Sequence, residues 1–347
     1  MRNQTGPPQE PVPPQVRYHP SIQAPVGGVS ARSTQTQKTG HPPQTGTGPR
    51  KVQQNQDATD PSVRPEPEPA AEGPDGLHEP VNRAPPSPEQ DLGAHLDRCA
   101  VEQVEVLTRG QRQNPDWFAW RKNRITASMA HCIARSRFVN GQRTAPPTSY
   151  LAAVTGERPR VQTRAMSWGV QMEAEAVRRY QELKSAALGR RVTVQDCGLF
   201  IDARRPWLGA SPDGIVTDSR TGQWLLCLEV KCPYKHRHGR VEDACRQDPA
   251  FCLQLQGEEP GKPPVYRLKA SHSYFTQIQC QLAVTGLKRA DLVVFTLQET
   301  AVVPVTFDPE LWEDVVSKLE VFYRDAVLPH IRKKTQLEGA ASWTPEL

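Results

Sequence analysis

The spacing of hydrophobic residues predicts that folded structure begins near Asp91 and then alternates helices with strands. Leu92, Leu96, Ala100 and Val104 recur every four residues, which is the spacing of one helix face. Further helices are expected over residues 128–134, 166–183, 241–251, 274–285 and 312–328. Loops are expected over 140–163 and after 329. Ser273 is the expected N-cap of the fourth of these helices, and Gly286 its expected C-terminal stop.

Alternating or wholly apolar runs predict a set of strands between these helices. They cover residues 191–202, 206–214, 223–232, 292–297 and 302–307. The run from Leu225 to Leu228 is apolar on both faces and is expected to be buried, whereas Pro304 marks an edge strand. The turn sequence from Asp218 to Gly222 predicts a hairpin. Together these elements predict an α/β fold with a mixed central β-sheet flanked by helices.

The chemistry-bearing residues gather at the end of the most apolar strand. Glu229 and Lys231 are two residues apart, so they project from the same strand face, while Val230 points into the core. The hairpin returns Asp213 to their side. Buried charges are costly unless they are paired or bind a metal. The three residues alone fit either a salt bridge or a site for a hard divalent cation.

Two further groups of residues carry competing interpretations. Arg121, Arg124 and Ser128 surround the start of a predicted helix, which suits an anion but also an ordinary helix cap. Glu173 lies on the helix over 166–183 and faces either a site or solvent. Tyr274, Gln277 and Gln281 form one stripe of a helix, which suits nucleic acid or an ordinary polar face.

Composition separates the chain into folded and unfolded parts. More than half of the 34 prolines precede residue 90, so residues 1–90 are expected to form a disordered tail that could carry protein-partner motifs. Residues 91–335 are the expected folded domain and 336–347 a flexible tail. The net charge of +5 is compatible with a polyanionic partner without requiring one. The cluster of Cys232, His236, His238, Cys245 and Cys252 matches no zinc-binding spacing.

The sequence predicts an intracellular protein with no membrane segment. No run approaches the roughly 18 apolar residues that span a bilayer, and the first residues lack the apolar core of a signal peptide. A nuclear or cytoplasmic location is expected, with a mitochondrial one left open.

In their order along the chain, the motifs resemble the YqaJ-like viral recombinase family, which includes lambda-type exonucleases, in the PD-(D/E)XK nuclease superfamily. The resemblance covers about residues 95–330. It depends on Trp117, Arg121 and Ile125–Ser128, then Trp168, Gly169, Glu173 and Tyr180, then 208–214, 228–233, and Tyr274 with 277–282. The proline-rich N-terminus lies outside it, and residues 235–264 are a longer insertion than in the phage enzymes.

The resemblance implies a restriction-endonuclease-like core and a role for each matching residue. Asp213, Glu229 and the Val230 carbonyl would bind Mg²⁺, or alternatively Mn²⁺, with Glu173 assisting. Lys231 would orient or deprotonate the attacking water. Arg121, Arg124 and Ser128 would contact DNA phosphate, and Tyr274 with Gln277 would bind DNA from the helix beside the active site.

The function expected on this basis is Mg²⁺-dependent hydrolysis of DNA, most simply by a 5′→3′ exonuclease acting on duplex ends in recombination or repair. A structure-specific endonuclease and a non-catalytic nucleic-acid-binding protein are the alternatives. The oligomeric state is open, because phage-type relatives encircle DNA as rings whereas this chain carries the insertion; a homo-oligomer is one alternative.

Overall fold

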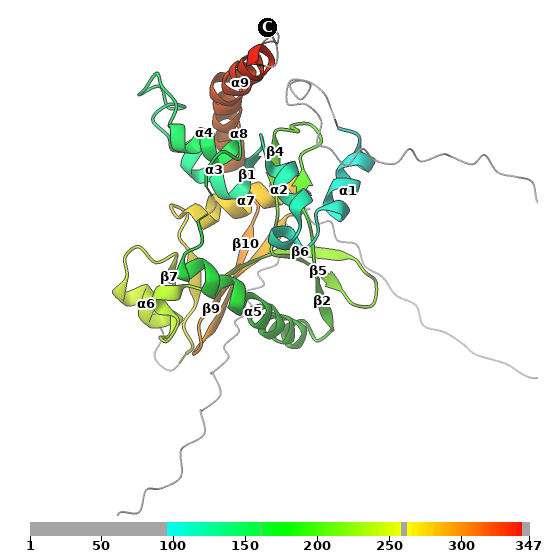
Figure 1. Cartoon of the computed structure of the whole chain (residues 1–347). Coiled ribbons are helices and arrows are strands. Elements are labelled where there is room, and N and C mark those ends of the chain that lie inside the picture. The colour runs from blue at the N-terminus through cyan, green and yellow to red at the C-terminus, as the bar shows by residue number, and fades with distance from the viewer. Residues whose placement is uncertain (1–95, 160, 258–261, 342–347) are drawn as a thin grey trace, which may run out of the picture. The chain divides into compact units, whose positions relative to one another are not determined.

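The computed structural model describes residues 96–159, 161–257 and 262–341 (Figure 1). The predicted disordered segment, residues 1–90, lies outside the described residues. Helix α1 (Arg98–Leu107) is the first described element.

A five-stranded mixed sheet with the order β10-β9-β6-β5-β2 forms the centre of the fold. β6 runs parallel to β9, and the other neighbouring pairs are antiparallel. The strands are β2 (Val192–Gln195), β5 (Gly214–Asp218), β6 (Trp224–Lys231), β9 (Arg289–Phe295) and β10 (Thr300–Thr306). This arrangement confirms the predicted mixed α/β core, the β5–β6 hairpin and the edge position of the strand that contains Pro304.

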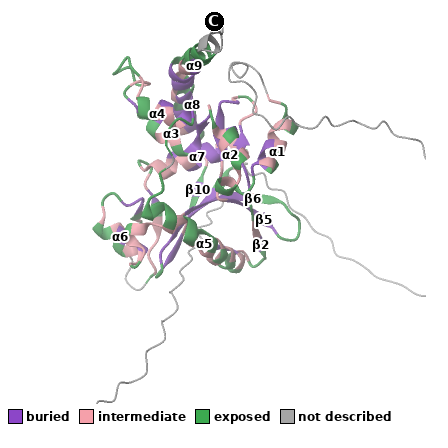
Figure 2. Ribbon diagram, viewed as in Figure 1, coloured by how far each residue is buried: buried purple, intermediate pink, exposed green. Residues whose placement is uncertain are grey.

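The two faces of this sheet pack against two different helices. Leu226, Leu228 and Val230 of β6 join the hydrophobic cluster under α5 (Arg164–Leu188). Cys227 lies on the other face, in the cluster that includes Ile278 of α7 (Ser273–Thr285). Because side chains alternate along a strand, Glu229 and Lys231 share the α7 face with Cys227. Figure 2 shows the central strands buried between these layers.

A second, three-stranded sheet and a helical layer complete the core. β1 (Ile125–Thr126), β4 (Leu208–Ala210) and β3 (Phe200–Ile201) pair in the order β1-β4-β3. Helix α3 (Ala127–Ala134) packs against α8 (Pro309–Phe322) in one apolar cluster. Turn η2 (Gln111–Gln113) and helix α2 (Pro115–Arg121) lead into β1.

The described part of the insertion, residues 235–257 and 262–264, contains a helix shorter than the one expected over 241–251, and a strand that was not expected. After the short 3-10 helix η3 (Tyr234–His236) come helix α6 (Val241–Gln247) and strand β7 (Leu253–Leu255). β7 pairs with β8 (Tyr266–Leu268). This short hairpin was not predicted, because each strand is only three residues long.

Several predicted boundaries are wrong. A short helix, α4 (Thr148–Val154), lies within the segment expected to be a loop. His272, rather than Ser273, caps α7, since its Nδ1 accepts the Tyr274 amide at 3.2 Å. Gly286 ends α7 in the left-handed region, as predicted.

The C-terminal helix also runs further than predicted. α8 continues through a π-helical segment, η4 (Tyr323–Val327), into α9 (Leu328–Ala341). The helix therefore covers the first six residues of the segment expected to be a flexible tail. Pro329, which has no amide donor, lies two residues after this π-helical segment, where the regular helical hydrogen bonding is already interrupted. Within the described residues, no helix has the length and apolar character needed to cross a bilayer.

Candidate active site

Asp213 lies next to the end of β6, in agreement with the predicted hairpin. The Asp213 amide donates to the Leu228 carbonyl at 3.0 Å, and its carboxylate Oδ2 accepts the Val230 amide at 2.7 Å. These two bonds hold the carboxylate at the strand end, next to Glu229 and Lys231. The turn between β5 and β6 is local in sequence, which is why the period-two pattern was sufficient to find this pair.

Glu229 is almost fully buried and is held by side chains from α7. It is 1% exposed, and its Oε1 and Oε2 accept the side-chain amides of Gln277 and Gln281, each at 2.6 Å. The Lys231 ammonium also donates to Glu229 Oε1. Gln277 was predicted to contact DNA, whereas here its amide orients Glu229. Gln281 is a site residue that the sequence placed in the right stripe without assigning it a role.

Carboxylates outnumber the Lys231 ammonium at this strand end, so negative charge is in excess. Burial raises the pKa of Asp213 well above its usual value, and the nearby Glu229 and Glu173 raise it further, opposed by Lys231. Burial lowers the pKa of Lys231, but Glu229 and Asp213 outweigh this, so the net shift is upward. Lys231 is therefore a charged hydrogen-bond donor in this arrangement. Burial also raises the pKa of Glu173.

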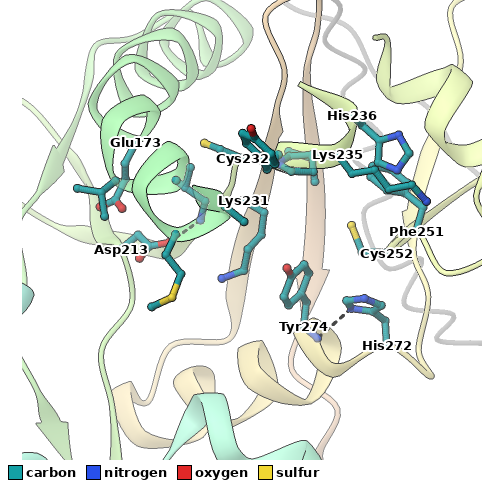
Figure 3. A pocket seen from close by; sticks show the side chains of 18 of the residues that line it. Glu173, Asp213, Lys231, Cys232, Lys235, His236, Phe251, Cys252, His272 and Tyr274 are labelled. Carbon is teal, nitrogen blue, oxygen red and sulfur yellow. Dashed lines mark hydrogen bonds between the residues drawn. The ribbon is translucent and has the colours of Figure 1, made fainter. Parts of the chain in front are cut away.

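A cavity of about 510 Å³ opens onto these residues (Figure 3). Glu173 of α5 and Asp213 lie on one side of it, and Lys231 projects between them and Tyr274. The Lys231 ammonium lies 4.7 Å from the centre of the Tyr274 ring. The insertion supplies the far wall through His236 and Phe251. The predicted residues Asp213, Lys231, Glu173, Val230 and Tyr274 thus line one cavity.

Arg112 also lines this cavity and was missed by the sequence analysis. It is exposed and follows Gln111, which adopts a left-handed backbone with φ of 43°. The Gln111 side chain donates to the carbonyls of Cys197 and Pro212 at 3.0 and 2.8 Å. A strained residue tied to the residue before Asp213 is typical of a functional site. The only sequence signal was Gly110, which precedes the strained turn.

Arg121 and Ser128 form a polar cluster with Thr126 at the start of α3, outside the cavity lining. The Arg121 guanidinium lies 3.9 Å from the centre of the Trp117 ring and donates to Thr126 Oγ1 at 3.4 Å. Burial and the charge of Arg112 lower the pKa of Arg121 to about 10. The Trp117 indole in turn donates to Ser211 Oγ at 2.9 Å, and this bond joins the cluster to the segment before Asp213. Ser128 is exposed.

Arg124 has a different environment from the one expected. It is 3% exposed, and its guanidinium donates to the Pro206 and Trp120 carbonyls at 2.8 and 2.9 Å. It therefore connects α2 to the β3–β4 turn, and this placement does not support the predicted phosphate contact.

The chemistry of the oxygen donors fits a hard divalent cation such as Mg²⁺. Glu229 and Glu173 both raise the pKa of Asp213, and Lys231 and the Val230 amide oppose them. Within the described residues, no group of three or more His, Cys, Asp and Glu side chains is close enough to enclose a metal ion by itself. A cation at Asp213 and Glu229 would therefore depend on backbone and water oxygens as well.

Comparison with known proteins agrees with the sequence motifs. Residues 116–288 match the model of the YqaJ-like viral recombinase domain. The chain belongs to this family. The alkaline nuclease of Autographa californica nuclear polyhedrosis virus is 28% identical over 230 residues, which cover 61% of this chain and 48% of that protein. The chain thus spans about half the length of this curated relative.

Two solved structures are similar to this chain over about two thirds of its length. An alkaline exonuclease (LHK-Exo) from Laribacter hongkongensis has 22% identity and a TM-score of 0.45, with coverage of 65% of this chain and 98% of that chain. The Shutoff and Exonuclease Protein from Kaposi's sarcoma-associated herpesvirus has 14% identity and a TM-score of 0.43, with coverage of 67% and 74%.

Proposed function

We propose that this YqaJ-family protein is a divalent-metal-dependent DNA nuclease that hydrolyses phosphodiester bonds, acting as a 5′→3′ exonuclease on duplex ends. The observation that carries the proposal is that Asp213 and Lys231 line an open cavity, while the buried Glu229 accepts a hydrogen bond from Lys231. The alkaline nuclease and exonuclease activities in the names of the similar proteins support it.

Each residue has a role that follows from its environment. Mg²⁺ bound at Asp213 and Glu229 would supply charge neutralisation for the phosphoryl oxygens. Gln277 and Gln281 hold Glu229 in one orientation, so the carboxylate is fixed before a substrate arrives. The Lys231 ammonium donates to Glu229 Oε1 and also lines the cavity, where it would stabilise developing negative charge and orient water. Glu173, across the cavity, would accept a hydrogen bond from that water.

The cluster of Arg121 and Ser128 provides a reason why the protein would act at the ends of DNA strands. Arg121 and Ser128 can bind a phosphate, and no carboxylate in the described residues contacts Arg121. Trp117, which lies under the Arg121 guanidinium, is hydrogen-bonded to Ser211, and this bond fixes the distance between the cluster and Asp213. A terminal 5′-phosphate bound there would set which phosphodiester bond reaches the cavity. This favours an exonuclease over the alternatives of an endonuclease and a non-catalytic binding protein.

The test is digestion of 5′- and 3′-labelled linear duplexes by the full chain in Mg²⁺, in Mn²⁺ and in EDTA. Glu229→Gln should abolish hydrolysis, whereas Glu182→Gln, an exposed glutamate of α5, should not. Early release of the 5′ label as mononucleotide supports the proposal, and cutting of a closed circle supports an endonuclease instead. Hydrolysis unchanged in Glu229→Gln would contradict the assignment of the site, and RNA of the same sequence tests the choice of DNA.

A further inference from the structure

Positive charge is concentrated in one stretch of the chain. Residues 121–158 contain seven lysine or arginine residues and one glutamate, a net charge of +6, although the whole chain carries only +5. The rest of the chain therefore sums to −1. Globular surfaces normally intersperse charges of both signs. A segment with this imbalance is a candidate contact for a polyanion.

Five of these cations are exposed, and we call them together the α3–α4 basic surface. It consists of Lys122, Arg135, Arg137, Arg143 and Arg158. None of the five forms an ion pair with another residue in the parts of the chain that the structure describes. The one acid in the segment, Glu157, is occupied by His330 and Lys334 of α9, at 3.2 and 3.0 Å. The positive charge of this surface is thus uncompensated.

The loop that carries three of the arginines is held in place by its own hydrogen bonds. The Asn140 side chain donates to the carbonyls of Ala134 and Ser136 at 3.1 and 2.8 Å. The Arg143 amide donates to the Arg137 carbonyl at 3.1 Å. Phe138 anchors the loop, with its ring centre 6.0 Å from that of Phe322 in α8. A preformed loop loses little conformational entropy when it binds a partner.

The acidic residues of the neighbouring helix α8 do not neutralise this surface. Trp312, Val315 and Leu319 pack in the cluster that also contains α3. Around the helix, Glu310, Glu313 and Asp314 are displaced from Trp312 by about 160°, 100° and 200°, and Glu320 by about 80°. All four are exposed, so the carboxylates of α8 lie off the face that packs against α3.

The basic surface adjoins the candidate active site. Lys122 follows directly after Arg121, and its Cγ lies 3.4 Å from the position of a Cβ at Gly156, so α2 and the end of α4 are neighbours. On the other side, His131 Nδ1 of α3 lies 3.0 Å from Thr276 Oγ1 of α7. Thr276 is two residues from Tyr274, which lines the cavity. The surface thus begins beside Arg121, and α3, whose end carries Arg135, contacts the helix that lines the cavity.

We infer that the α3–α4 basic surface binds the phosphate backbone of a nucleic-acid duplex whose end enters the cavity. The placement of the duplex end rests on the proposed function, but binding itself requires no hydrolysis. A duplex fits better than an acidic protein, because several cations without carboxylate partners, three of them on a fixed loop, suit a line of phosphates.

The test measures binding of a fluorescent blunt duplex to the full chain in EDTA, over a series of salt concentrations. The variant Arg135→Gln/Arg137→Gln/Arg143→Gln is compared with Arg204→Gln/Arg220→Gln/Arg289→Gln, which removes three exposed arginines elsewhere. Each phosphate contact contributes about 0.9 to the slope of log affinity against log salt. The first variant should lose about 2 to 3 in slope and at least about tenfold in affinity at low salt, and the second should match the wild type.

Equal binding by the two triple variants would overturn the inference, as would tighter wild-type binding to a single strand or to an acidic protein than to the duplex. Circular dichroism and melting curves that match the wild type would show that the first variant is folded. If the wild type failed to hydrolyse DNA while the first variant still lost duplex binding, the nuclease proposal would fail and the surface would stand.

Discussion

The buried ion pair between α5 and β9 gives the sharpest prediction about stability. Lys184 and Asp291 are 2.6 Å apart, with side chains only 11% and 3% exposed, and the Tyr180 hydroxyl donates to the same carboxylate oxygen at 2.7 Å. Removing one partner of a buried pair leaves an uncompensated charge and costs about 3–5 kcal/mol. Lys184→Met and Asp291→Asn should therefore each destabilise the fold by about 4 kcal/mol.

The assay is urea unfolding followed by tryptophan fluorescence and circular dichroism. With a slope of about 2.5 kcal/mol per molar urea, a loss of about 4 kcal/mol lowers the midpoint by about 1.6 M. The double variant Lys184→Met/Asp291→Asn should lose less than the sum of the single variants by about 2 kcal/mol, because the second substitution removes the stranded charge. Tyr180→Phe should lose about 2 kcal/mol by itself, the loss of one hydrogen bond to a charged group.

Two results would refute this reasoning. Single variants that lose under about 1 kcal/mol would mean that water reaches the pair and solvates the remaining charge. Additive losses in the double variant would mean that Lys184 and Asp291 act independently despite their contact. Lys318→Met, which breaks the more exposed pair with Asp314 on α8, is the matched control and should lose about 0.5 kcal/mol.

The remaining predictions concern the site and its supports. Arg112→Ala should lower kcat/KM on linear duplex by about 10- to 100-fold, the loss of one charge-assisted contact, while Arg289→Ala leaves it unchanged; equal rates for all three proteins would contradict a role in substrate binding. Gln281→Leu should lower kcat and stability together, because a buried oxygen of Glu229 loses its 2.6 Å donor, and full activity would show that Gln277 is sufficient. Gly198→Ala should cost about 3 kcal/mol in urea unfolding, because its Cβ would lie 2.0 Å from the Glu105 carbonyl oxygen. Gly169→Ala, in open space on α5, should be neutral or stabilising, and a similar loss in both variants would contradict the clash.

The sequence was most informative where structure is local. The turn at 218–222 fixes the β5–β6 register, and strand alternation then places Glu229 beside Lys231 and opposite Asp213. Both features depend on residues fewer than twenty positions apart. The family motifs, which match over 116–288, supplied the order of the remaining pieces.

Side-chain direction was harder to predict because distant residues decide it. Arg124 turns inward because the Pro206 carbonyl, 82 residues later in the chain, meets its guanidinium. Gln277 turns toward Glu229, 48 residues earlier. Arg112 escaped notice because its position depends on the tie between Gln111 and Pro212, 101 residues apart. A rule based on the spacing of residues along the sequence cannot predict these contacts.

The buried ion pair between Lys184 of α5 and Asp291 of β9 also matters for the site. Tyr180 and Lys184 follow Glu173 by seven and eleven residues, which are two and three helical turns, so all three residues share one helix face. At Tyr180 and Lys184 this face lies over β9 and is buried, whereas at Glu173 it opens onto the cavity. The bonds to Asp291 therefore fix the rotation of α5 about its axis, and that rotation directs Glu173 toward Asp213. Because Asp291 pairs with Leu228 in the β6–β9 ladder, the strand that carries Glu229 and the helix that carries Glu173 are aligned through the same residue.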